Sequence, residues 1–195
     1  MKLLGYISTA VVVLMLTLSS CNKFEFPEYP AGPIPNWTDT VETTGKAYNM
    51  YYSLAQGNAV VLDFSAMWCP PCLTAAPQVD SVFTHFGSGN GNVKVFEFLF
   101  QNPAGLPSDS SDLSNWETNL NLSMPGFYDC QDIFDDYANT FGSSIPIILV
   151  FIPNEDTEDP GNSTLVYDYG NGLGVTGGSN TIYSDIKSVL EANGF

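Results

Sequence analysis

The chain has 195 residues, of which 21 are aspartate or glutamate and only five are lysine, with no arginine, so its formal net charge is −16 at pH 7. This balance argues against nucleic acid and anionic lipid surfaces as partners, because both are bound mainly through Lys and Arg contacts to phosphate. A hydrophobic content of 44% excludes a disordered tail and is sufficient for a buried core.

The first 20 residues have the layout of an export signal: a single lysine, an apolar run over residues 10–18, and small residues before Cys21. The apolar run is too short for a stable membrane span. The segment LSSC, Leu18 to Cys21, resembles the lipobox of bacterial lipoproteins, in which the cysteine is lipidated and becomes the mature N-terminus. We therefore expect a lipid anchor at Cys21. The alternative is an ordinary secretory signal with Cys21 removed or free.

Residues 21–38 are expected to form the lipidated N-terminus and a tether. The segment carries four prolines, whose spacing fits an extended chain that would hold a folded domain away from the lipid surface. The alternative is a segment that packs its aromatic side chains, Phe24, Phe26 and Tyr29, against the domain.

Residues 39–195 are expected to form one α/β domain without internal repeats, with an insertion over about residues 101–126. Hydrophobic periodicity and turn residues delimit its elements. In chain order these are a helix over 39–55, a strand over 59–64, a helix over 70–86, a strand over 93–100, a short helix around 113–120, a helix over 131–141, strands over 147–152 and 164–169, and a helix over 181–192. The first strand, the helix after it and the next strand form a β-α-β unit, so these two strands should be parallel.

Cys69 and Cys72 lie at the carboxyl end of the first strand, the edge at which open α/β sheets commonly place their sites. As a purely structural disulfide, the pair would close a very short loop and would stabilise the fold by only about 2 kcal/mol. As a zinc site it would need Cys130 and His85, and His85 lies about four helical turns away, so no metal is expected. A reversible redox couple accounts for the pair better.

The position at a helix start explains how such a couple would work. Side chains three residues apart in a first helical turn are close enough to form and break a disulfide. The thiol at the helix start meets unpaired amides and the positive end of the helix dipole, which favour thiolate. Cys69 is thus the expected nucleophile and Cys72 the resolving partner. The two prolines between them fit the first turn, and leave mainly the amides of Cys72 and Leu73 as donors to the Cys69 sulfur.

The segment VVLDFSAMWCPPCLTAAP, residues 60–77, resembles the active-site segment of the thioredoxin superfamily. Besides the two cysteines, it has Asp63 six residues before Cys69, Trp68 directly before it, and Pro77 eight residues after it. The resemblance implies an α/β fold with a central mixed β-sheet flanked by helices.

The segment SSIPIILVF, residues 143–151, resembles the loop and strand where this superfamily carries a cis-proline facing the cysteines. The resemblance makes Pro146 that proline. Ile145 would then present backbone groups to an extended substrate segment beside the disulfide. The alternative is a proline that merely starts a strand.

With the export signal, the lipobox and the insertion, the chain most resembles exported thioredoxin-like lipoproteins of the TlpA kind, over roughly residues 40–195. It departs from them in two respects. Ala75 or Ala76 replaces the glutamate that often follows the two cysteines, and Asp63 replaces a common asparagine. No lysine takes the place of the one that accompanies the buried aspartate in thioredoxin.

Three further residues have expected roles. Burial should raise the pKa of Asp63, which suits a base that removes the proton of Cys72, and the alternative is a carboxylate satisfied by backbone donors. Trp68 is expected to shield the disulfide and to form part of a docking surface, unless it only packs. Cys130 is expected to be a small buried hydrophobic residue rather than a third redox thiol.

We therefore predict a membrane-tethered thiol-disulfide oxidoreductase in the bacterial cell envelope, facing the periplasm or the cell surface. It would need no cofactor besides its own cysteines. Its partners would be protein disulfides or dithiols and a membrane or periplasmic redox partner. The alternative is a non-catalytic thioredoxin-fold binding module of a cell-surface complex.

Overall fold

The computed structural model describes residues 25–175 and 181–195. The predicted export signal and the lipidation at Cys21 lie outside these residues. Within the described part of the chain, no helix is long and apolar enough to cross a membrane.

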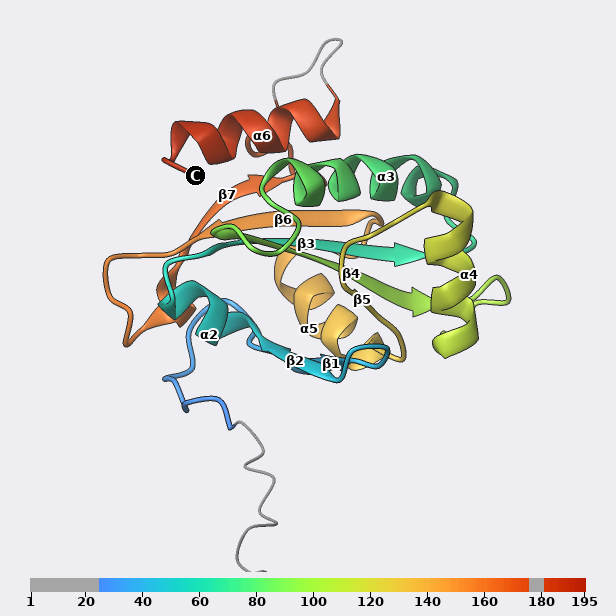
Figure 1. The fold of residues 1–195 in the computed structure, drawn as a ribbon, viewed down its shortest axis with the longest axis horizontal. Helices are drawn as coiled ribbons and strands as arrows, with labels where there is room; N and C mark the ends of the chain where they lie inside the picture. The colour runs from blue at the N-terminus through green and yellow to red at the C-terminus, as the bar shows by residue number, and fades with distance from the viewer. Residues whose placement is uncertain (1–24, 176–180) are drawn as a thin grey trace, which may run out of the picture.

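The core of the molecule is a five-stranded mixed sheet with the strand order β5-β4-β3-β6-β7 (Figure 1). The central strand β3 runs parallel to β4 and antiparallel to β6. Strand β5 is parallel to β4, and β7 is antiparallel to β6. The strand bounds are β3 (Ala59–Ala66), β4 (Val93–Gln101), β5 (Gly126–Phe127), β6 (Ile147–Ile152) and β7 (Thr164–Asp168). The parallel β-α-β unit and the mixed sheet expected from the sequence are confirmed.

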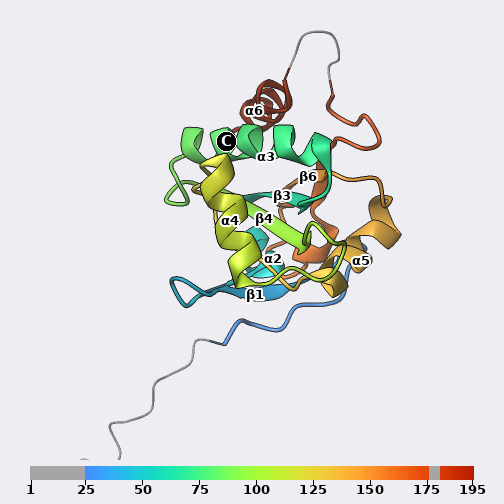
Figure 2. The same ribbon diagram turned by 90° about the vertical axis from the view of Figure 1, so that its right-hand side faces the viewer.

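Helices cover both faces of this sheet (Figures 1 and 2). Helices α3 and α6 lie on one face, α2 and α5 lie on the other, and α4 packs beside β5 and α3. Their bounds are α2 (Met50–Ala55), α3 (Pro70–His85), α4 (Ser110–Leu120), α5 (Gln131–Phe141) and α6 (Ile182–Ala192), with a short 3-10 helix η1 (Pro160–Asn162) before β7. Apart from α2, the helices agree with the expected ranges to within a few residues.

The prediction of a helix over residues 39–55 is wrong for the first two thirds of this range. The chain instead forms an antiparallel hairpin of β1 (Thr38–Val41) and β2 (Lys46–Asn49), and only α2 is helical. Gly45 occupies the left-handed region at the turn, with φ of 65°, and β-branched residues before it favour a strand. The side chain of Asn49 then accepts a hydrogen bond from the Tyr52 amide at 2.7 Å, which starts the helix there.

Residues 26–37, which belong to the segment predicted as an extended tether, lie against the domain. The ring of Tyr29 meets the ring of Tyr51 edge to face. Ile34 and Trp37 are buried, and the Trp37 ring contacts three phenylalanine rings of the sheet. The Tyr51 hydroxyl accepts from the Gly32 amide at 3.1 Å and donates to the Ile34 carbonyl. The apolar residues between the prolines therefore dock this segment on the fold.

A close backbone contact makes this docking testable. A Cβ atom on Gly32 would overlap the backbone of Gly161 in η1, whereas a Cβ on Gly170 would make an ordinary contact. We expect Gly32→Ala to lower the free energy of unfolding by about 1 to 3 kcal/mol in urea denaturation, because the segment must shift. Gly170→Ala should change it by less than about 0.5 kcal/mol. Equal stability of the two variants would contradict the docked arrangement.

Candidate active site

Cys69 and Cys72 form a disulfide at the junction of β3 and α3, with their Cα atoms 5.3 Å apart. Cys69 is the N-cap of α3, and Pro70 and Pro71 are its first two residues. Strand β3 ends at Ala66, so the buried strand delivers the cysteines to the edge of the sheet. The structure thus brings the two cysteines together where the sequence places them.

The start of α3 gives the Cys69 sulfur one backbone donor. Its Sγ accepts from the Cys72 amide at 3.2 Å. The Leu73 amide, expected as a second donor, instead donates to the Cys69 carbonyl at 3.3 Å. Because the two prolines have no N–H, the negative charge of a Cys69 thiolate would be stabilised by the Cys72 amide and the helix dipole.

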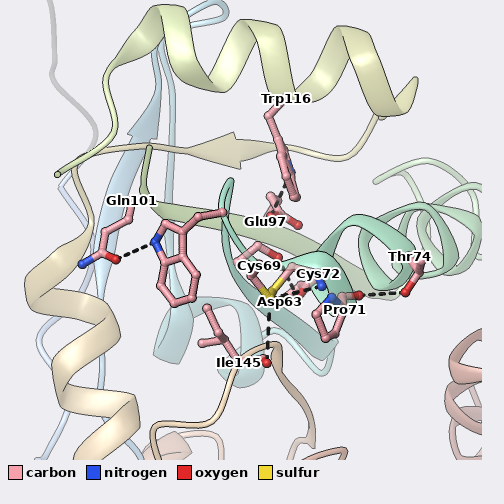
Figure 3. The surroundings of a disulfide bond; sticks show 11 residues. Asp63, Cys69, Pro71, Cys72, Thr74, Glu97, Gln101, Trp116 and Ile145 are labelled. Atoms are coloured by element: carbon pink, nitrogen blue, oxygen red, sulfur yellow. Dashed lines mark hydrogen bonds between the residues drawn. A yellow bond between two sulfur atoms is a disulfide. The ribbon is translucent and has the colours of Figure 1, made fainter. Parts of the chain in front are cut away.

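The surroundings of the disulfide distinguish its two ends. Cys72 is completely buried, whereas Cys69 retains 2% exposure. The Cys69 Sγ lies 3.8 Å from the Ile145 carbonyl oxygen, and the Ile145–Pro146 peptide bond is cis (Figure 3). The loop before β6 therefore faces the disulfide, as the resemblance implies.

Trp68 lies on the surface beside the disulfide, with 48% of the residue exposed. Its Nε1 donates to the Gln101 side chain at 2.9 Å. Gln101 in turn donates to Gln131 at 3.2 Å, and Gln131 donates to Asp135 at 2.8 Å. This chain of hydrogen bonds links the indole, through Gln101 at the end of β4, to the start of α5.

Asp63 is fully buried in the middle of β3, and its Oδ1 accepts from the Ser65 hydroxyl at 3.4 Å. Burial raises the pKa of Asp63 from 3.8 to about 7, although the hydrogen bond from Ser65 opposes the shift. The pKa of Asp63 is therefore shifted upward, as expected from the sequence. Its carboxyl group can gain or lose a proton near neutral pH.

Glu97 is a second buried acid that the sequence analysis missed. It lies on β4 directly across from Asp63, and the Trp116 indole Nε1 donates to its Oε1 at 3.1 Å. Burial and then the charge of Asp63 raise the pKa of Glu97 well above its ordinary value. In general, two negative charges about 4 Å apart repel by about 4 kcal/mol at an effective dielectric constant of 20. Ionising both of these neighbouring carboxyl groups is therefore unfavourable. A lone glutamate inside the apolar run VKVFEFLF was the available signal.

Cys130, the N-cap of α5, and His85, at the end of α3, are the remaining candidate groups. Cys130 is a buried free thiol, and burial raises its pKa well above the ordinary value, which disfavours the reactive thiolate. His85, at the end of α3, lies beside Tyr183 and Glu191 of α6. Among the described residues, no group of three or more His, Cys, Asp or Glu side chains is arranged to hold a metal ion.

No protein-family model and no curated protein sequence matches the chain. Solved structures do match it. StoA from Bacillus subtilis has a TM-score of 0.54 at 16% identity, over 83% of this chain and 99% of that one. A thioredoxin-family thiol:disulfide interchange protein from Chlorobium tepidum TLS has a TM-score of 0.52 at 15% identity, over 85% of this chain and 98% of that one. A secreted disulfide oxidoreductase of Mycobacterium tuberculosis has a TM-score of 0.50 at 17% identity, over 80% of this chain and 95% of that one.

These matches establish the fold: the chain has a thioredoxin-like fold, with a mixed sheet flanked by helices. The Cys69–Cys72 disulfide lies at the junction of β3 and α3 within it.

The raised pKa of Asp63 predicts how stability depends on pH. Because the folded protein holds this proton more tightly than the unfolded chain, the free energy of unfolding should fall as pH rises from about 4 to about 8. Asp63→Asn should remove roughly 3 to 5 kcal/mol of this decline, at 1.4 kcal/mol per pKa unit. Urea denaturation of the oxidised protein across this range measures it, with the exposed Glu155→Gln variant as control. Parallel curves for wild type and Asp63→Asn would contradict the prediction.

Proposed function

We propose that the protein is a thiol-disulfide oxidoreductase that exchanges disulfides with exported proteins through Cys69 and Cys72. The observation that carries the proposal is the disulfide at the N-terminus of α3, with one sulfur facing the Ile145 carbonyl beside a cis-proline. The thioredoxin-like fold supports it, because the matched structures include thiol:disulfide interchange proteins. No cofactor or metal enters the reaction.

In the reducing direction, the Cys69 thiolate attacks one sulfur of a substrate disulfide. The substrate S–S bond breaks, a mixed disulfide forms at Cys69, and the first substrate sulfur leaves as a thiolate. Asp63 then takes the proton of Cys72, and the Cys72 thiolate attacks the Cys69 sulfur. The Cys69–Cys72 bond forms and the second substrate thiolate leaves, so that two electrons have passed to the substrate. The reverse sequence oxidises a dithiol.

Substrates would dock around Trp68 and the loop of Ile145 and Pro146. The exposed indole, together with the exposed side chains of Leu73 and Leu106, offers apolar surface to a partner. An extended substrate segment could pair with the backbone at Ile145, which would bring its disulfide to the Cys69 sulfur.

The location of the protein is part of this proposal. The lipobox-like segment ending at Cys21 supports a lipid anchor, and one matched structure is described as secreted. Because the chain packs against the domain from Phe26 onward, four residues separate a lipidated Cys21 from the docked segment. The five steps along the chain from Cys21 to Phe26 span at most about 18 Å, so the domain would lie close to the membrane surface. A membrane or periplasmic redox partner would then regenerate the cysteine pair.

A non-catalytic binding module is the second candidate, and the small exposure of Cys69 is the observation that favours it. Such a module would keep the docking surface around Trp68 and never open its disulfide. The two candidates differ in whether the sulfurs react with a partner protein.

Insulin reduction with dithiothreitol as reductant separates them. We expect activity in the wild type, a loss of about 100-fold or more in Cys69→Ala, and covalent partner adducts on Cys69 in Cys72→Ala, because the resolving thiol is missing. The matched control is Cys130→Ala, which removes a buried thiol that is not part of the disulfide and should retain activity and trap no partner. Absence of both insulin reduction and trapped partners would favour the binding module.

A further inference from the structure

The buried carboxyl groups of Asp63 and Glu97 face each other across the central strand pair. The two residues are directly paired in the parallel register of β3 and β4, whose backbones lie about 5 Å apart. Asp63 has no exposed surface and Glu97 has 1%. In the view of Figure 3, Glu97 lies between Trp116 and the region where Asp63 and the disulfide overlap.

Each carboxyl group has one oxygen with a donor and one without. Ser65 donates to Oδ1 of Asp63, and the Trp116 indole donates to Oε1 of Glu97. Among the described residues, Asp63 Oδ2 and Glu97 Oε2 find no donor, although both atoms are buried. Buried polar atoms are rarely left unpaired, and two carboxylates have no proton to offer each other. A proton retained by one group satisfies both oxygens with a single hydrogen bond.

The surroundings supply no counter-ion for a second negative charge. Apart from burial and the two carboxyl groups themselves, the pKa values of Asp63 and Glu97 are shifted by Ser65 and Trp116. No lysine or histidine of the described chain is among these groups. Cys130, before α5, is a further titratable group near the pair, because the charge of Glu97 raises the pKa of its thiol. The Cys69–Cys72 disulfide lies at the start of α3, after the strand that carries Asp63. Strand β6 places Ile148 beside Asp63.

We propose that Glu97 keeps its proton at neutral pH and donates it in a hydrogen bond to Asp63 across β3 and β4, so that Asp63 can serve as an anionic base for Cys72. Glu97 is thus a positioning residue that acts through Asp63, and the kinetic part of this inference rests on the proposed function. The burial-raised pKa values of both groups agree with this order of ionisation, in which Asp63 loses its proton first.

The proton balance of the resolving step follows from this arrangement. Before the step, the Asp63–Glu97 pair holds one proton and one negative charge. Asp63 accepts the Cys72 proton as the Cys72–Cys69 bond forms and the bond from Cys69 to the substrate sulfur breaks. The pair then holds two protons and is neutral, and the negative charge leaves on the substrate thiolate. When the disulfide is reduced again, Asp63 returns its proton to Cys72.

Infrared spectroscopy of the oxidised protein tests the retained proton without any activity. At about pH 8.5, far above the ordinary pKa range of carboxyl groups, the wild type should show the C=O stretch of one protonated carboxyl group. Glu97→Gln, which keeps a hydrogen-bond donor of similar shape, should lack this band. Identical spectra of the two proteins in this region would overturn the proposal, whatever the enzyme assays show.

The pH profile of resolution tests the role of the hydrogen bond. Reduced protein mixed with 5,5′-dithiobis(2-nitrobenzoate) should release one thionitrobenzoate when Cys69 attacks and a second when Cys72 resolves the mixed disulfide. The pH at which the rate of the second phase reaches half its maximum should agree in wild type and Glu97→Gln to within about half a pH unit. In Glu97→Met, which has similar volume and no donor, it should rise by about one unit or more, and the second phase should be about 10-fold slower at pH 7.

The first phase serves as the internal control, because Glu97 does not act on the Cys69 attack. A merely structural role of Glu97 would affect both phases or both variants alike, and thermal unfolding of the variants would show it. An unchanged second-phase midpoint in Glu97→Met, or an equal shift in Glu97→Gln, would overturn the proposal. Absence of both phases in the wild type would instead refute the proposed oxidoreductase, and the infrared result would still test whether the carboxyl pair retains a proton.

Discussion

The pairing of β3 with a strand on each side is the constraint on which the rest of the structure depends. All eight residues of β3 are buried between β4 and β6, so the strand has one register and ends at a fixed point, Ala66. The chain then turns directly into α3, which places Cys69 at the N-cap and Cys72 in the first turn. The geometry of the cysteine pair is therefore set by the packing of a central strand, not by the flexibility of a loop.

The same burial decides the electrostatics of the site. A strand covered on both faces carries Asp63 into the core, and its neighbour β4 brings Glu97 opposite it. In a chain with 21 acidic residues and five lysines, the pair is satisfied by a shared proton instead of a cation. A carboxyl pair that can hold either one or two protons is suited to chemistry in which a neighbouring thiol must lose and regain its proton.

The sequence predicted the parts of the fold whose signals are local. The strand before Cys69, the helix after it and the strand after Pro146 each carry their own hydrophobic pattern. The hairpin of β1 and β2 was missed because its strands contain too few residues to show a period of two. Glu97 was missed because its importance comes from its register with Asp63, and register between strands separated by a helix is a tertiary property that no single segment encodes.

The proposed function requires that Cys69, despite its small exposure in the disulfide, becomes a reactive thiolate when the pair is reduced. Alkylation of the reduced protein by iodoacetamide as a function of pH measures this directly, with modified residues identified by mass spectrometry. The account predicts that Cys69 reacts first and titrates below the free-cysteine pKa of about 8.5, while buried Cys72 remains unmodified. Equal inertness of both thiols, or a Cys69 that titrates like free cysteine, would contradict it.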